Sequence, residues 1–210
     1  MTETANAPSA SETVQQATTR RVSPLIVVLL VASAALLIAS MRLPWWSITM
    51  WAPQYPQGLT ATATLTAIVG EDVPEIDELN HYIGMMPLNE AAQFERSISI
   101  PMVIAMAAAL IISIWTRNWL RWVLRLPAVI FPVFFLADLK FWLWYAGNNL
   151  DPSAALSSTI SAFTPTALGW GKVAQFHTYG WLQAGFWLAL AAAVLTLLTL
   201  IPLRRKGRTA

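Results

Sequence analysis

One short segment of the chain carries side chains that could bind a metal ion. It contains His81, Met85 and Met86, and Glu78 precedes them. Residues three and four apart lie on one face of a helix, so Glu78, His81 and Met85 would share a face if the helix continues through Gly84. Imidazole and thioether ligands favour copper, and a methionine sulfur favours Cu(I). The segment predicts a copper site; the alternative is a surface histidine that hydrogen-bonds its loop.

Three further residues could contribute polar chemistry near the apolar stretches. Asp138 lies inside the third stretch, where an ionisable side chain is costly and usually meets a partner or a water-filled cavity. We interpret Asp138 as a proton or cation contact; a structural hydrogen bond, with Arg96 as a candidate partner, is the alternative. Lys140 can extend its amine to the membrane surface. His177 could add a ligand to a site shared between loops, or form hydrogen bonds at the interface.

Composition excludes several other cofactors and activities. The chain has no cysteine, which rules out thiolate-bound iron–sulfur clusters and covalent haem attachment. Its two histidines, His81 and His177, both lie outside the apolar runs, so we expect no haem held within a membrane. No nucleophile–base, phosphate-loop or HExxH pattern occurs, and we expect no enzyme. A net charge of +2 predicts no nucleic-acid surface.

Four long apolar stretches indicate an integral membrane protein. The chain is 56% hydrophobic and only 11% charged, whereas soluble domains carry about 25% charged residues. About 20 apolar residues in a helix cross a hydrocarbon core of about 30 Å. The sequence therefore predicts an all-α membrane fold with four transmembrane helices, although the first stretch could instead be a cleaved signal peptide. The predicted helices cover residues 23–41, 98–116, 119–145 and 179–202.

Basic residues predict the orientation of these helices. Arginine and lysine cluster around 20–21, 117–125 and 204–208, which fall on one side of the membrane if there are four spans. The positive-inside rule then places both termini in the cytoplasm. We expect a multi-pass protein of the bacterial cytoplasmic membrane, in contact with the lipid bilayer. Residues 1–22 are predicted to be disordered, and 203–210 form a basic cytoplasmic tail.

Two segments, 42–97 and 146–178, are then predicted to be extracytoplasmic loops. In the first, threonine alternates with small or apolar residues over 59–69, a period typical of a half-buried strand. Asp72 and the proline that follows at 74 favour the start of a short helix, which should end near residue 84. The second loop is rich in turn-forming residues.

Both outer segments contain unusual short motifs, at 52–59 (APQYPQGL), 79–85 (LNHYIGM), 147–152 (GNNLDP) and 163–165 (FTP). Together they resemble a family of bacterial membrane proteins associated with nitrous oxide reductase gene clusters and copper-enzyme maturation. The resemblance covers roughly 45–180 and implies an extracytoplasmic module that serves a copper enzyme. Carried over to this chain, it points to residues of both segments, namely Asn80, His81, Met85, Asn149 and Asp151.

Two functions follow as expectations. The first is an accessory protein that handles copper or serves maturation of a nitrous oxide reductase-type enzyme, through a membrane or periplasmic partner. The alternative is a non-catalytic subunit of a larger respiratory or oxidase complex, because the apolar stretches are rich in tryptophan and poor in catalytic groups. A transporter is disfavoured, because we find neither inverted repeats nor several polar residues within the stretches.

Overall fold

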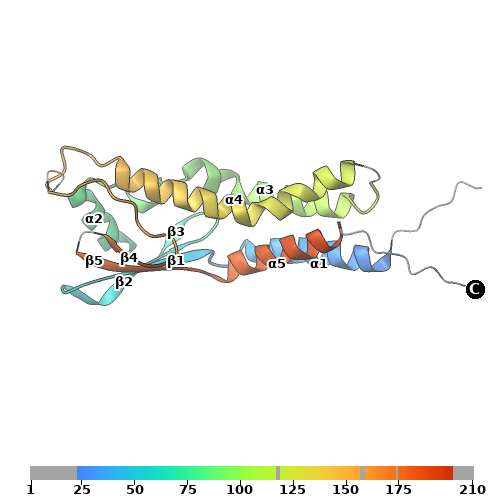
Figure 1. Ribbon diagram of the computed structural model, residues 1–210, viewed down its shortest axis with the longest axis horizontal. Coiled ribbons are helices and arrows are strands. Elements are labelled where there is room, and N and C mark those ends of the chain that lie inside the picture. Colours follow the sequence, from blue (N-terminus) through green and yellow to red (C-terminus); the bar gives the residue numbers. More distant parts are fainter. Residues whose placement is uncertain (1–22, 117–118, 157–158, 174, 201–210) are drawn as a thin grey trace, which may run out of the picture.

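The chain folds into two layers that run along the long axis of the molecule (Figure 1). The computed structural model describes residues 23–116, 119–156, 159–173 and 175–200, so the predictions for 1–22 and 203–210 lie outside it. One layer combines a β-sheet with two helices, and the second layer is helical. The first layer's helices are α1 (Pro24–Ser40) and α5 (Ala184–Leu198); the second layer holds α2 (Val73–Ile83), α3 (Gln93–Ile112) and α4 (Leu120–Asn148).

The sheet has five antiparallel strands in the order β3-β2-β1-β5-β4. Its centre is the pairing of β1 with β5, which runs from Trp46 opposite Leu182 to Trp51 opposite His177. This pairing joins the two segments that we expected to be separate loops into one module. The strands are β1 (Trp46–Ala52), β2 (Tyr55–Ala63), β3 (Ile68–Val69), β4 (Gly169–Val173) and β5 (Phe176–Leu182).

The prediction of an all-α fold with four transmembrane helices is therefore wrong. The chain is a mixed α/β protein, and two of its described helices are long and apolar enough to cross a membrane. In β5, buried residues alternate with more exposed ones at the period of a strand. Thr178 and Gly180 are buried, whereas His177 is exposed and Tyr179 half-buried. The expected strand over 59–69 is divided into β2 and β3, and the expected short helix is present as α2.

All four apolar stretches are helical, but their bounds differ from the expected ones. Helix α3 begins at Gln93 and α4 continues to Asn148. Helix α5 begins only at Ala184, because residues 179–182 belong to β5. Neighbouring helices pack as α1 with α5, α5 with α4, α4 with α3, and α3 with α1. The result is a four-helix bundle beside the sheet module.

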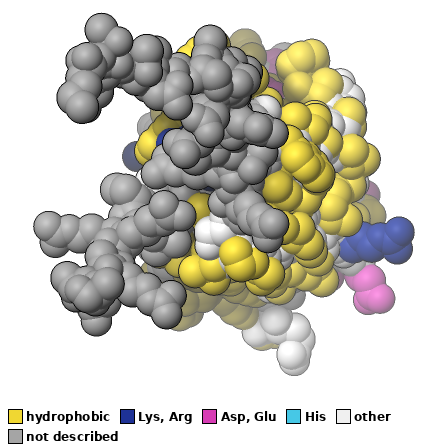
Figure 2. Space-filling model, turned by 90° about the vertical axis from the view of Figure 1, so that its right-hand side faces the viewer, with side chains coloured by type: hydrophobic (Ala, Val, Ile, Leu, Met, Phe, Trp, Pro, Cys, Tyr) yellow, Lys and Arg dark blue, Asp and Glu magenta, His cyan; other side chains and the backbone are white. Residues whose placement is uncertain are grey.

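Helices α3 and α4 are long and apolar enough to cross a membrane, with 20 and 29 residues. Only 28% and 22% of their most apolar windows are buried inside the protein, so most of this apolar surface faces outward. Helices α1 and α5 are apolar but shorter, with 17 and 15 residues. Seen from the end away from the sheet, the described flank of the bundle is largely hydrophobic (Figure 2).

Helix α4 belongs to both parts of the molecule. Its first half contributes Ala128 and Phe131 to the core of the bundle. Its second half packs Leu139 and Leu143 against the core of the sheet module. Together with α2, this half covers one face of the sheet, and the opposite face is left uncovered by the described elements (Figure 1).

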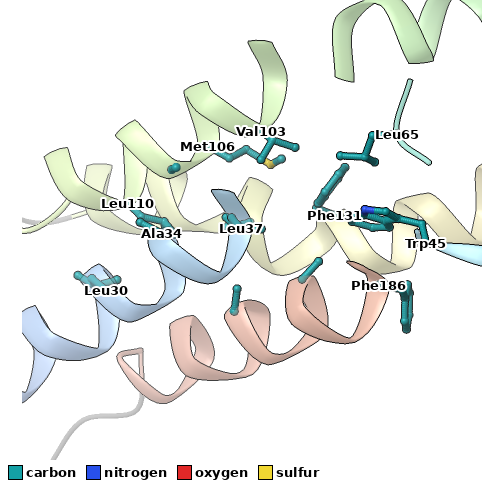
Figure 3. Packing of buried hydrophobic residues seen from close by; sticks show 14 of the residues in the cluster. Leu30, Ala34, Leu37, Trp45, Leu65, Val103, Met106, Leu110, Phe131 and Phe186 are labelled. Atoms are coloured by element: carbon teal, nitrogen blue, oxygen red, sulfur yellow. The ribbon is translucent and has the colours of Figure 1, made fainter. Parts of the chain in front are cut away.

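Trp45 holds the junction between bundle and sheet. The side chain is fully buried, and its Nε1 donates a 3.0 Å hydrogen bond to the carbonyl oxygen of Ser40. Its ring lies 4.9 Å from that of Phe135 and 5.2 Å from that of Phe131 (Figure 3). A Cβ at Gly185 would lie 2.5 Å from the indole, so this glycine lets α5 approach closely. One side chain thus joins α1, α4 and α5.

Arg125 anchors the other end of the bundle, although we expected it to mark a basic flank. It is 4% exposed. Its Nε donates to Ser113 Oγ at 2.9 Å, and one terminal nitrogen donates to Thr199 Oγ1 at 3.1 Å. Because a buried guanidinium needs hydrogen-bond acceptors, these contacts bind the start of α4 to the ends of α3 and α5.

The substitution Trp45→Ala should lower the free energy of unfolding by about 3–5 kcal/mol, as for other buried aromatic side chains replaced by alanine. Equilibrium unfolding in mixed detergent micelles measures this change. The matched control is Trp115→Ala, because Trp115 is 74% exposed and should change stability by no more than about 0.5 kcal/mol. Equal losses in the two variants would contradict the junction role.

Candidate functional site

The helical face that we expected to run from Glu78 through His81 to Met85 is not formed. Helix α2 ends at Ile83, and Gly84 has a φ of 82° in the left-handed region. The N–H of Met85 donates to the carbonyl oxygen of Asn80 at 2.8 Å, closing the helix with a glycine cap. Met85 therefore follows the cap and does not extend the helix.

The loop after α4 lies against this end of α2. The N–H of Asp151 donates to the carbonyl oxygen of Gly84 at 2.8 Å, and the N–H of Leu156 donates to that of Tyr82 at 3.0 Å. A Cβ at Gly84 would lie 2.6 Å from the Asp151 carbonyl oxygen, so the contact also needs a glycine. Asp151 and His81 interact electrostatically, and the structure thus brings these two residues of the resemblance together.

The other residues expected at a metal site are placed separately. His81 is exposed, and Met85 and Met86 are half-buried. Asn80 is buried, and its Nδ2 has no hydrogen-bond partner. Asn149 Nδ2 donates to the carbonyl oxygen of Tyr145 at the end of α4, 2.9 Å away. Within the described ranges, no group of three or more histidine, aspartate or glutamate residues is placed to hold a metal ion.

His177 lies apart from the histidine of α2. His177 pairs with Trp51 in the sheet and lies on the uncovered face, whereas α2 packs on the opposite face. The shared site that would use both histidines is therefore not assembled. The Glu78 carboxylate interacts electrostatically with the Tyr55 hydroxyl of β2. The same hydroxyl donates a hydrogen bond to Glu75.

The uncovered face of the sheet carries a row of aromatic side chains, which we call the aromatic ladder. Trp51 lies 5.7 Å from Trp170, Trp170 lies 5.0 Å from Tyr179, and Tyr179 lies 5.8 Å from Trp181, measured between ring centroids. Trp170 is 71% exposed. Beside the ladder, the hydroxyls of β1 and β2 pair across the strands at 2.8–2.9 Å. The uncovered face of the sheet thus presents aromatic rings and hydroxyl groups in neighbouring rows.

A cavity of about 120 Å³ lies where the module meets the bundle, and we call it the junction cavity. Most of its wall is apolar. Its charged lining comes from the first turns of α3 and the middle of α4. The charged residues are Glu95, Arg96 and Asp138. Thr64, Ser99 and Trp142 add polar groups, and the apolar residues include Leu65, Met102, Phe131, Phe134 and Phe135.

The junction cavity brings together Asp138 and Arg96, as the sequence suggested, but without a hydrogen bond between them. Arg96 donates to Asn89 Oδ1 at 2.8 Å, to the Leu88 carbonyl oxygen at 2.9 Å and to the Ala91 carbonyl oxygen. Its interaction with Asp138 is electrostatic. The guanidinium thus holds the turn before α3 in place.

Sequence reasoning missed two other polar residues of the cavity. Glu95 precedes Arg96 in a segment that we assigned to a loop, but α3 begins two residues earlier. Trp142 stands four residues after Asp138, one helical turn away, but we did not single it out from the sequence. The Glu95 Oε2 and Trp142 Nε1 atoms are buried without hydrogen-bond partners. The helical spacing was the available signal for Trp142.

Comparison with known proteins adds no family to this description. No protein-family model matches the chain, and no significant match is found among curated proteins or solved structures.

The pKa of Asp151 lies below its usual value because Ser153 donates its hydroxyl and N–H to the carboxylate, at 2.7 and 2.8 Å, and His81 adds a favourable charge. A lowered pKa in the folded state stabilises the fold above the unfolded pKa of about 3.9, and this contribution is lost as the pH falls through the folded pKa. Ser153→Ala should raise the pKa of Asp151 toward 3.9, measured by NMR titration of labelled carboxyl carbons.

Ser161→Ala is the matched control, since this exposed serine lies in the same loop. An unchanged pKa of Asp151 in Ser153→Ala, or an equal shift in both variants, would show that Ser153 does not hold the carboxylate in its charged form.

Proposed function

We propose that the protein is a multi-pass accessory protein of the bacterial cytoplasmic membrane that binds a partner through an extracytoplasmic sheet module. The outward-facing apolar surfaces of α3 and α4 support the membrane location, because a soluble helix of this length would bury most of that surface. Helices α1 and α5, which are shorter, pack alongside them.

The distribution of charge supports an orientation with both termini in the cytoplasm. Arg121 and Arg125 lie at the start of α4, at the end of the bundle away from the sheet. The flanking sequences at 20–21 and 204–208 are also basic. In the sheet module and its connections, residues 41–97 contain more acidic than basic side chains. The positive-inside rule then places the module outside.

Single cysteines test this orientation cleanly, because the chain has no cysteine of its own. In intact spheroplasts, a membrane-impermeant maleimide should label Lys172→Cys, on the exposed side of β4. It should label Arg121→Cys, an exposed position at the far end of the bundle, only after the membrane is permeabilised. Labelling in the reverse order would overturn the proposed topology.

The aromatic ladder is the observation that carries the partner-binding function. Strand β1 follows α1 after a short connection, and β5 leads through Gln183 into α5, so the sheet continues the line of these helices (Figure 1). In a membrane the ladder would stand upright beside the bundle rather than lie on the headgroups. A neighbouring membrane protein with its own extracytoplasmic part would meet this surface.

The composition of the ladder also suits a protein partner. Tryptophan and tyrosine contribute a large share of the energy in protein interfaces, and charged residues are depleted at interface cores. On β1, β4 and β5, the uncovered face carries a single lysine, Lys172. Apolar residues of the adjoining helices are also exposed, with Val28 on α1 63% exposed and Trp187 on α5 54% exposed.

The identity of the partner rests on the motif resemblance alone, which favours a copper enzyme of the nitrous oxide reductase type. In that version, His81, Met85 and Met86 lie at one end of α2 where a copper ion could be handed over. The alternative partner is a respiratory or oxidase complex in which this chain is a structural subunit. The copper content of the captured partner distinguishes the two versions.

Site-specific photo-crosslinking in the native host tests partner binding. A benzophenone amino acid at position 172 should give an adduct with one protein that also co-purifies in fixed stoichiometry. The same probe at Lys140, an exposed position on α4, should not. Trp170→Ser should reduce co-purification, because it removes the most exposed ring of the ladder, whereas Trp144→Ser on α4, 48% exposed, should leave it unchanged.

Three outcomes would contradict the proposal. One is an equal yield of adducts from positions 172 and 140. The second is an adduct with a second copy of this chain, which would make the ladder a self-association surface. The third is a solitary, monodisperse protein with no adduct at position 172.

A further inference from the structure

The junction cavity contains two carboxylates whose charge is not neutralised by a hydrogen-bonded basic group. Glu95 and Asp138 repel each other across it, and Glu95 Oε2 is buried without a hydrogen-bond partner. Arg96 directs its described hydrogen bonds to the turn at residues 88–91. Arg96 lines the same cavity and attracts both carboxylates. A buried carboxylate oxygen without a donor is still unfavourable, so Glu95 Oε2 lacks a hydrogen-bond donor.

The apolar walls favour an organic cation over a metal ion. Phe131, Phe134 and Phe135 line the cavity, and aromatic rings attract ammonium groups through their π-electrons. A hard metal ion would need about six oxygen ligands. The described lining supplies two carboxylates and the hydroxyls of Thr64 and Ser99, both of which already donate to backbone carbonyls. The charge and the rings together suit an ammonium group.

We propose that the junction cavity binds a primary ammonium group on a small, oxygen-bearing carbon chain, the chemistry of ethanolamine. The ammonium donates to Glu95 Oε2 and to the Asp138 carboxylate. An oxygen on the neighbouring carbon accepts from Trp142 Nε1, a buried donor that interacts with the Asp138 carboxylate but lacks a well-aligned hydrogen-bond partner. One ligand then satisfies Glu95 Oε2 and completes the hydrogen bonding of Trp142 Nε1.

The size and position of the cavity agree with such a ligand. A cavity of about 150 Å³ can hold benzene, so one of about 120 Å³ accommodates the few heavy atoms of ethanolamine. The cavity adjoins Phe134, which is half-exposed on the outer surface of α4. In the proposed membrane arrangement this position lies near the outer headgroups, and the ammonium could come from a free amine or from an aminophospholipid.

Calorimetric titration of the full-length protein, purified in an amine-free detergent, tests this inference independently of any partner. Ethanolamine hydrochloride should bind to the wild type, and sodium chloride at the same ionic strength should not. Glu95→Gln and Asp138→Asn should each weaken binding at least about tenfold, the effect of removing one charged hydrogen bond. Ethylamine, which lacks the oxygen, should bind more weakly than ethanolamine.

The matched control is Glu90→Gln, an exposed acid close to the same turn, which should bind ethanolamine like the wild type. Both cavity variants remove a repelling charge, so their thermal unfolding without ligand should be no lower than that of the wild type. Nanodiscs distinguish the two sources of the ammonium group. If a lipid headgroup fills the cavity, ethanolamine should bind more weakly in nanodiscs of phosphatidylethanolamine than in nanodiscs of phosphatidylglycerol. If ethanolamine binds equally well in both lipids, the ligand is a soluble amine.

The inference fails if ethanolamine gives no more heat than sodium chloride, or if sodium binds equally well. It also fails if Glu95→Gln and Asp138→Asn retain wild-type affinity. None of these results bears on the aromatic ladder, so failure here leaves partner binding to its own test.

Discussion

The ladder of backbone hydrogen bonds between β1 and β5 connects two segments that lie far apart in the sequence. Each strand is continuous with an apolar helix, so this pairing also sets α1 beside α5 and fixes the side of the bundle from which the sheet projects. Strands β2, β3 and β4 then add to its two edges. The helices of the second layer cover only one side of the result, which leaves the aromatic ladder open.

Local sequence patterns identified the helices and the short α2, because apolar runs and glycine caps act over a few residues. They did not identify the sheet. Strand β5 adjoins α5 with a single residue between them, so its apolar residues merged with the following helix into one long stretch. The β1–β5 pairing is also non-local, and alternation in one short strand does not specify its partner.

The junction cavity illustrates the same limit for a site. Asp138 and Arg96 could be singled out because ionisable residues are costly within or beside apolar stretches. Glu95 and Trp142 gain their significance only when the first turn of α3 lies against the middle of α4. Conversely, Arg125 looked like a topological marker but is buried between three helices. The position of a charged residue relative to the apolar stretches could be read from the sequence. The groups that surround its side chain became known only from the fold.

Helix α4 is one uninterrupted rod of 29 residues, about 43 Å long at 1.5 Å per residue, and it serves as the spine of both the bundle and the sheet module. No hinge loop separates the two parts along this element. A tilt imposed on one end is therefore transmitted to the other, with Pro127 and Pro132 as the points at which the rod can flex. The orientation of the sheet module is thus coupled mechanically to that of the bundle.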